Sequence, residues 1–237
     1  MYVKSTHSTN TLMREMIASG DAPAYIYAGY QTAGRGQTGN GWESEADKNL
    51  LCSILLPPRK NLFELNVIAS VATQRLLGEG FTIKWPNDIY WQDKKIAGIL
   101  IENAITGNEV KYSIAGIGIN INQTRFVSGA PNPVSLKQIT GKEYDTGELM
   151  RQLYAEVQRA QEEDVWEEYK AHLYRREGFW PFVERMVNTA PTMNADKSET
   201  GIFMARIEDV LPTGEIVLRD EKNIQRIYHF KQIRYVL

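Results

Sequence analysis

Hydrophobic positions in the first eighty residues repeat at two different periods. Residues 8–19 place four apolar side chains on one helical face, follow Ser, Thr and Asn capping candidates, and end before Gly20. Residues 61–77 show the same helical spacing and also stop at glycines. Residues 24–32 and 50–56 are rich in β-forming side chains instead. The pattern therefore predicts helix, strand, strand and helix, in that order.

The next forty residues read as strands that follow one another directly. The four segments are 81–86, 88–92, 95–105 and 109–121, and turn-forming dipeptides separate the later ones. Strands without intervening helices favour an antiparallel arrangement. A loop rich in Gly, Pro and Asn follows at 128–142, and residues 146–174 then read as one long amphipathic helix.

The pattern of hydrophobic and polar residues changes again near residue 185. Residues 202–210, 215–220 and 224–230 are short β-rich runs separated by turn residues, and a last short strand follows. Short strands at such tight spacing predict a small barrel. The expected fold is α+β, with a mixed, mainly antiparallel sheet and flanking helices at 1–185 and a small all-β domain at 186–237.

Composition narrows the class of protein without deciding its chemistry. In 237 residues, 43% are hydrophobic and 24% charged, which is ordinary for a globular protein. No apolar run approaches the roughly 18–20 residues that cross a bilayer, and the polar N-terminus has no signal-peptide character. One cysteine, Cys52, leaves no intrachain disulfide and fits a reducing compartment. We therefore expect a cytoplasmic protein without a membrane partner.

Charge and metal-ligand spacing exclude two further classes. The formal net charge is −2, whereas dedicated nucleic-acid binders usually carry a basic surplus, so no nucleic-acid partner is expected. The three histidines and Cys52 lie far apart, with no spacing typical of a zinc site.

A glycine-rich loop, Gly34-Arg35-Gly36-Gln37-Thr38-Gly39, lies between the first two β segments. It matches the dinucleotide-binding pattern in letters, but that pattern requires a helix directly after the loop, and here another strand follows. Glycines let backbone N–H groups approach an anion, and Arg35 adds a bidentate cation. A ligand clamp and a solvated surface loop both remain open at this point.

The segment Lys84-Trp85-Pro86-Asn87-Asp88, followed by Lys95-Ile96-Ala97-Gly98, places two lysines beside one acid and one amide. Pro86 interrupts a ladder, which puts Asn87 and Asp88 in a bend between strands. Lysines would neutralise phosphate oxygens, and a lone carboxylate with substrate phosphates suffices for Mg²⁺. A hairpin with solvated charges is the alternative.

Alternate glycines mark the segment Gly116-Ile117-Gly118-Ile119-Asn120. They leave one face of a strand without side chains, as a strand requires when something flat lies on it, although close backbone packing has the same effect. Cys52 lies within an apolar run and is interpreted as a small buried hydrophobe rather than a nucleophile.

Taken in order, these segments resemble the catalytic domain of biotin–protein ligases. The matching pieces are Ser8-Thr9-Asn10, Gln31-Thr32-Ala33-Gly34-Arg35-Gly36, Trp42, Lys84 to Asp88, Lys95 to Glu102, and Gly116 to Asn120. The resemblance is clear over residues 7–122 and weaker beyond. It implies a sheet related to class II aminoacyl-tRNA synthetases and a C-terminal SH3-like barrel. Because the first motif begins at Ser8, a short form without an N-terminal DNA-binding domain is expected.

The resemblance also implies a two-step reaction. The biotin carboxylate attacks the α-phosphate of ATP to give biotinyl-5'-adenylate and pyrophosphate, with ATP and Mg²⁺ as co-substrate and metal. A lysine of a biotin carboxyl carrier protein then attacks the mixed anhydride and releases AMP. The oligomeric state is left open, with a homodimer as one state to test.

By the same resemblance, each motif residue receives a role. The catalytic set is Lys95, Arg35, Asp88 and Lys84, with Asp88 also the candidate magnesium ligand. The biotin-binding set is Ser8, Thr9, Asn10, Gln31, Gly34, Gly36, Gly98, Gly116 and Gly118. The nucleotide-binding set is Arg35, Trp42, Lys84, Asn87, Lys95 and Asn120.

One position departs from the family pattern. The family often has a second arginine after Arg35-Gly36, where this chain has Gln37. Since that arginine helps to retain the adenylate, faster release of the intermediate is our hypothesis. A lipoate or octanoate transferase, which would need Cys52 as nucleophile in its octanoyl version, and a non-enzymatic binding module are the competing functions.

Overall fold

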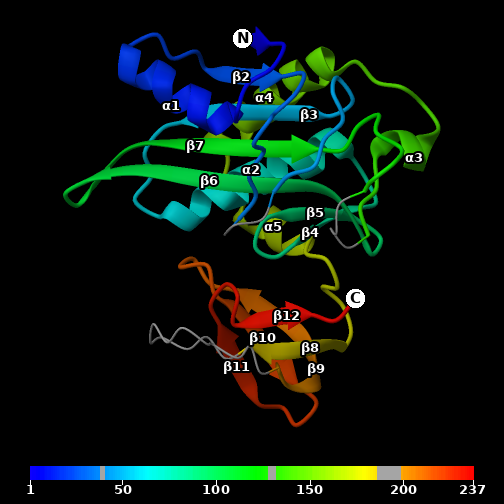
Figure 1. Cartoon of the computed structure of the whole chain (residues 1–237). Helices are drawn as coiled ribbons and strands as arrows, with labels where there is room; N and C mark the ends of the chain where they lie inside the picture. Colours follow the sequence, from blue (N-terminus) through cyan, green and yellow to red (C-terminus); the bar gives the residue numbers. More distant parts are fainter. Residues whose placement is uncertain (38–40, 128–131, 186–198) are drawn as a thin grey trace.

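A seven-stranded mixed sheet forms the larger part of the molecule, with strand order β1-β2-β3-β7-β6-β5-β4 (Figure 1). The computed structural model describes residues 1–37, 41–127, 132–185 and 199–237. Only β1 and β2 pair in parallel, and all other neighbours are antiparallel. The strands are β1 Tyr2–Val3, β2 Tyr25–Ala28, β3 Leu50–Leu56, β4 Phe81–Lys84, β5 Asp88–Trp91, β6 Lys94–Thr106 and β7 Glu109–Ile119. The mixed, mainly antiparallel sheet is confirmed.

Helices cover both faces of this sheet. Helix α1 (Thr9–Ser19) packs on β2, β3 and β7, whereas α2 (Leu62–Leu77) and α4 (Thr146–Glu162) pack on the other face (Figure 1). Met13 of α1 meets Ile26 and Ile114 in a small apolar cluster. Within the described ranges, no helix has both the length and the apolar character needed to cross a membrane.

The predicted helix at 146–174 is two helices, so the single-helix prediction was wrong. Helix α4 ends at Glu162, and α5 (Trp166–Ala171) begins after a break at which Glu163 is extended. The Asp164 carboxylate accepts a hydrogen bond from the Trp166 backbone N–H, which favours the start of a new helix over continuation of α4. A short helix missed by the periodicity, α3 (Leu136–Thr140), begins with a capping box formed by Ser135 and Gln138.

The C-terminal part is a five-stranded antiparallel sheet with order β11-β10-β9-β8-β12. Its strands are β8 Trp180–Arg185, β9 Glu199–Val210, β10 Ile216–Asp220, β11 Gln225–Tyr228 and β12 Ile233–Tyr235. No closed barrel forms among the described strands, although Arg226 and Tyr228 of β11 both reach Glu184 of β8. The sheet includes residues 180–185, which the expected division at 186 assigned to the first domain.

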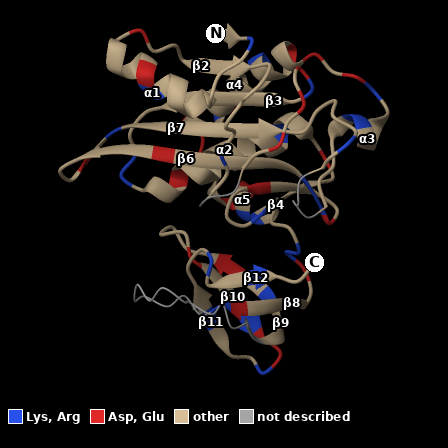
Figure 2. Ribbon diagram, viewed as in Figure 1, with Lys and Arg blue, Asp and Glu red and all other residues tan. Residues whose placement is uncertain are grey.

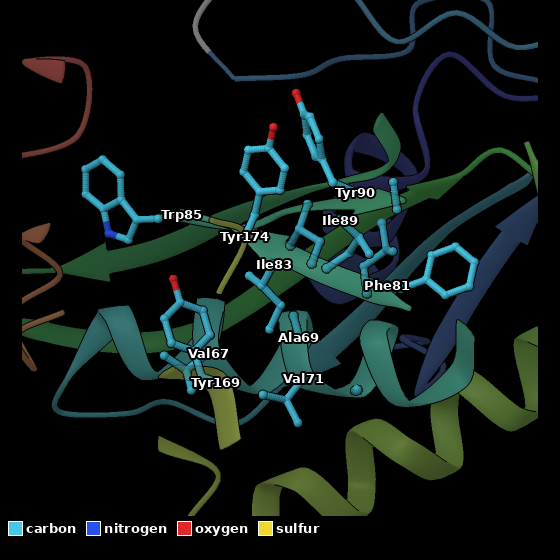
Figure 3. Close-up of a cluster of buried hydrophobic side chains, with 14 of the residues drawn as sticks. Val67, Ala69, Val71, Phe81, Ile83, Trp85, Ile89, Tyr90, Tyr169 and Tyr174 are labelled. Atoms are coloured by element: carbon cyan, nitrogen blue, oxygen red, sulfur yellow. The ribbon is translucent and has the colours of Figure 1, made fainter. Parts of the chain in front are cut away.

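One continuous apolar core joins the two sheets. Figure 3 shows side chains of α2, β4 and β5 gathered with Tyr169 and Tyr174. At the junction, the Trp85 indole N–H donates to the carbonyl of Gly214 at 3.0 Å, and the Tyr174 and Tyr235 rings lie 5.8 Å apart. The C-terminal sheet is therefore held against the end of the central sheet at which β4 and β5 turn.

Candidate active site

A cavity of about 760 Å³ lies between the α1 face of the central sheet and the C-terminal sheet. Residues from the start of α1, the glycine loop, five central strands (β3 to β7) and the C-terminal part of the chain line it. The lining residues include Ser8, Thr9, Asn10, Gln31, Arg35, Gly36, Gln37, Trp42, Cys52, Lys84, Asp88, Lys95, Gly98, Gly116, Gly118, Arg185, Phe230, Lys231, Ile233 and Arg234.

The strand glycines make room for side chains of the protein itself. A Cβ at Gly116 would lie 2.5 Å from Oδ1 of Asn10, and a Cβ at Gly118 would lie 2.5 Å from the indole of Trp42. Gly98, which pairs with Gly118 across β6 and β7, would place a Cβ 3.0 Å from the same ring. The flat object predicted to lie on this bare strand face is thus the indole, with the cavity around it.

Polar groups gather at one end of the cavity, which we call the amide end. The backbone N–H and hydroxyl of Thr9 both donate to Gln31 Oε1, at 2.7 and 3.2 Å. The hydroxyl of Ser53 donates to Asn10 Oδ1 at 2.5 Å. Ser8, Thr9 and Asn10 are all buried, so the start of α1 presents fixed donors and acceptors rather than solvated ones.

Charged groups gather at the other end, which we call the cation end. Lys95 Nζ lies 2.7 Å from Asp88 Oδ1, and both side chains are 31% exposed. Lys84 donates to the Tyr90 hydroxyl at 3.0 Å and lies over the rings of Tyr90 and Tyr235. Burial lowers the pKa of Lys84 to about 8, against the opposing attraction of Asp88.

The C-terminal sheet adds further positive charge to the cavity wall. Arg185, Lys231 and Arg234 line it, and Figure 2 shows blue positions on that sheet where it faces β4 and β5. Among the described lining residues, six are basic (Arg35, Lys84, Lys95, Arg185, Lys231 and Arg234) and one, Asp88, is acidic. Such a surplus in a partly enclosed site favours a polyanionic ligand.

Comparison with known proteins identifies the family. The profile of the Biotin/lipoate A/B protein ligase family matches residues 2–120, which is half of the chain. The chain belongs to this family. It is 29% identical over 190 residues to the bifunctional ligase/repressor BirA of Escherichia coli (strain K12), covering 75% of this chain and 55% of that protein. It is 31% identical over 158 residues to the biotin--[acetyl-CoA-carboxylase] ligase of Paracoccus denitrificans, covering 61% of this chain and 65% of that protein.

Solved structures of the family share the fold over the whole chain. The biotin protein ligase from Aquifex aeolicus, in complex with biotin and ATP, aligns with a TM-score of 0.78 and 22% identity, covering 100% of this chain and 98% of that one. The ligase from Leishmania major, in complex with biotinyl-5-AMP, aligns with a TM-score of 0.64 over 96% of this chain and 97% of that one. At these identities the likeness establishes the arrangement of both sheets.

The predicted site residues line the cavity except for Gly34, Asn87 and Asn120. The Gly34 carbonyl accepts from the Trp42 backbone N–H at 3.0 Å, which sets the base of the glycine loop. Asn87 is buried between Gln37 and Asn66, with hydrogen bonds of 3.1 and 2.7 Å. The Asn120 amide donates to the Val134 carbonyl. None of the three lines the cavity, although Gly34 and Asn87 each form a hydrogen bond with a residue that does.

Arg35 lies at the amide end rather than beside the lysines. Its Nη2 is 3.2 Å from Glu102 Oε1 and donates to the Thr11 hydroxyl at 3.2 Å. Glu102 is four residues along β6 from Gly98, a span of about 13 Å in an extended strand. Arg35 thus lines the cavity without joining Lys95, and its assigned role in phosphate neutralisation stays a prediction.

Gln37, which the sequence marks only by its departure from the expected arginine, lines the cavity next to Asn87, while Thr38 to Asn40 of the same loop lie outside the described residues. The C-terminal residues Arg185, Phe230, Lys231, Ile233 and Arg234 also line it, although they follow no motif. They could not be predicted as one group, because Arg185 ends β8, Phe230 and Lys231 lie between β11 and β12, and only Ile233 and Arg234 belong to β12.

Cys52 behaves as the sequence predicts for a small buried hydrophobe. Its side chain is buried, its thiol donates weakly to the Ile117 carbonyl, and burial raises its pKa to about 12. A thiol with that pKa carries almost no thiolate at neutral pH, which argues against nucleophilic catalysis.

Proposed function

We propose that this chain is an ATP-dependent biotin–protein ligase. It would form biotinyl-5'-adenylate from biotin and ATP, then transfer the biotinyl group to a lysine of a biotin carboxyl carrier protein. Family membership supports this, as do the names of the curated relatives and the ligands named in the related structures. The observation that carries the proposal is a single cavity with hydrogen-bonding groups at one end and a cation surplus at the other.

The first chemical step brings a carboxylate against a polyanion. The carboxylate oxygen attacks the α-phosphorus, and the bond to the β-phosphate oxygen breaks as pyrophosphate leaves. Lys95, whose Nζ lies 2.7 Å from Asp88, would hold the carboxylate against the α-phosphate. Lys84 and the C-terminal basic residues would offset the charge of the leaving group.

In the second step, the lysine amine of the carrier attacks the anhydride carbonyl, and the bond to AMP breaks. The amine must lose a proton on the way. Asp88 lines the cavity and is the carboxylate assigned to position or deprotonate it. This assignment and that of Ser8, Thr9, Asn10 and Gln31 to the ureido group of biotin are proposals.

The cavity fits a nucleotide with its metal. The Trp42 indole N–H is buried and has no partner among the described residues, so a ligand acceptor beside it would satisfy the group. Within the described ranges, no group of three or more His, Cys, Asp or Glu could hold a metal by itself. Mg²⁺ would therefore be held by Asp88 together with substrate phosphates, and would supply charge neutralisation.

Finer features of the fold belong to the same proposal. A seven-stranded, mainly antiparallel sheet with helices on both faces supports a class II synthetase-like catalytic domain. Arg226 and Tyr228 of β11 contact Glu184 of β8 although β10 and β9 lie between them in the sheet, which supports an SH3-like domain. We place the domain boundary just before Trp180, where that sheet begins.

The decisive experiment incubates the pure protein with biotin, MgATP and an apo carrier domain, and weighs the carrier by intact mass spectrometry. A gain of one biotinyl group, with no gain when lipoate replaces biotin, is expected. A lipoyl gain would instead assign the lipoate branch of the family, and no gain in either reaction would contradict a ligase.

A matched pair of variants ties the activity to the cavity. Lys95→Ala removes the cation beside Asp88 and should lower the adenylation rate by roughly 100-fold or more, the size of effect typical for a lost transition-state contact. Lys94→Ala changes the adjacent exposed lysine, which does not line the cavity, and should leave the rate unchanged.

A further inference from the structure

Glu102 sits on β6 at the amide end and contacts three donors, two on α1 and one in the glycine loop. Its Oε2 accepts from Asn10 Nδ2 at 3.1 Å and from Arg14 Nη2 at 2.7 Å, and its Oε1 lies 3.2 Å from Arg35 Nη2. Glu102 does not line the cavity itself. It therefore acts on a ligand only through the residues that it holds.

The Asn10 amide is fixed from both sides by this arrangement. Ser53 donates to its oxygen, and Glu102 accepts from its nitrogen, so the amide cannot rotate without losing both contacts. Its oxygen lies directly over Gly116, where a Cβ would be 2.5 Å away. Asn10 is only 3% exposed, so solvent cannot substitute for a lost partner.

The same carboxylate ties the glycine loop to α1. Arg35 comes from that loop, and its guanidinium contacts both Glu102 and the Thr11 hydroxyl. Gln31, a few residues earlier, is anchored to Thr9. Arg14 and Arg35 are themselves 48% and 43% exposed, so the ion pairs add little stability as such, and their effect is geometric.

We infer that Glu102 is a positioning residue, which orients the Asn10 amide for a ligand ring that carries hydrogen-bond donors and acceptors. This inference rests on the proposed function, since it takes the ureido ring of biotin as that ligand. On this inference, the carboxylate of Glu102, which does not line the cavity, contributes to the selectivity for biotin at the amide end. The phosphate chemistry at Lys95 does not depend on it.

A double-mutant cycle on the full chain tests the inference by direct binding, without turnover. Calorimetric titration with biotin compares the unaltered protein with Glu102→Ala, Asn10→Ala and the double variant. Glu102→Ala should weaken biotin binding roughly tenfold, and should cause no further weakening once Asn10 is alanine. Affinity for MgATP in the absence of biotin should stay unchanged.

Control variants separate positioning from folding. Glu109→Ala removes an exposed carboxylate at the start of β7, paired with Lys111, and should leave biotin binding unchanged. Glu102→Gln keeps an oxygen acceptor for Asn10 and should weaken binding by less than Glu102→Ala, even if the alanine variant folds poorly. Equal biotin affinity in both Glu102 variants and the unaltered chain, or fully additive effects in the cycle, would overturn the inference. Absence of biotin binding by the unaltered chain would overturn the proposed function first.

Discussion

Lys84 gives the cation end a pH dependence near neutrality. Its pKa is lowered to about 8 mainly by burial, so it is protonated below that pH and loses its charge above it. Because phosphate binding favours the protonated form, the KM for ATP should be flat below pH 7. It should rise up to about tenfold for each pH unit above 8. Initial rates at several ATP concentrations between pH 6.5 and 9.5 measure this.

Lys84→Arg supplies the matching control. A guanidinium stays charged throughout this pH range, so the rise in KM should disappear even if the absolute KM changes. The same rise in the arginine variant would assign the titration to a different group. The lowered pKa of Lys84 also affects folding stability. Burial of the charged amine disfavours folding below about pH 8, and this cost decreases as the pH rises toward 10.5, the pKa of the lysine in the unfolded chain.

Gln37 occupies the position at which the sequence analysis expects a second arginine. It lines the cavity and donates to Asn87 at 3.1 Å, but it brings no charge. Gln37→Arg should slow release of the adenylate by roughly tenfold, through an added charge-assisted hydrogen bond. Stopped-flow release of preformed adenylate measures the rate, and an off-rate equal to that of the unaltered chain would refute the hypothesis.

At the level of elements, the glycines of β6 and β7 leave one face of these strands without side chains, and this space is needed by Trp42 and Asn10. Gly118→Ala would place a methyl group 2.5 Å from the Trp42 ring, and the ring must move or the strand must shift. Biotin affinity should fall at least tenfold. Gly201→Ala, on β9, places its methyl group in open space at an ordinary φ and should change nothing. Calorimetric titration of both variants checks the contrast.

Most elements could be predicted from periodicity because each buries one face. The strands from Phe81 to Ile119 alternate or run apolar between recognisable turns, and α1 and α2 carry clear apolar faces. The break at Glu163 is not visible in the periodicity, because apolar side chains continue past it; Asp164 favours a new start locally, and Arg75, which is distant in sequence, pairs with both Glu163 and Glu168. The pattern of Trp180–Arg185 as a strand is clear only once β9 and β12 lie beside it.

For the molecule as a whole, the turn between β9 and β10 links the two sheets. Gly214 there has φ +101°, and a Cβ would lie 2.6 Å from Phe63 at the start of α2. Gly214→Ala should therefore lower the melting temperature by several degrees and raise the KM for ATP, since overpacking costs about 1–3 kcal/mol.

Gly107→Ala is the control for that substitution. Gly107 also has a positive φ, +60°, but a Cβ there meets open space. The Gly107→Ala variant has alanine in a strained backbone conformation but no steric clash. Its melting temperature should therefore fall by less than that of Gly214→Ala, and its KM for ATP should stay constant. Equal effects of the two variants would show that the turn does not hold the sheets together.

The site could be predicted from sequence only as far as its motifs extend. Lys84 to Asp88 and Lys95 to Gly98 lie on neighbouring strands of one sheet, and Ser8 to Asn10 start a helix packed on that sheet; side chains from all three motifs line one cavity. Arg185, Lys231 and Arg234 reach that cavity through the docking of a second sheet, which local sequence does not encode. Glu102 was visible within a motif, but its partners come from α1 and the glycine loop.

The shared wall of the cavity also has a thermodynamic consequence. A molecule that touches Lys95 on one side and Arg234 on the other adds its own binding free energy to the cohesion of the two sheets. At a ligand concentration 100 times its Kd, this linkage amounts to about 2.7 kcal/mol. The thermal stability of the protein therefore depends partly on the concentration of its ligands. Depletion of these ligands would lower the free energy of unfolding of the whole chain as well as the occupancy of the site.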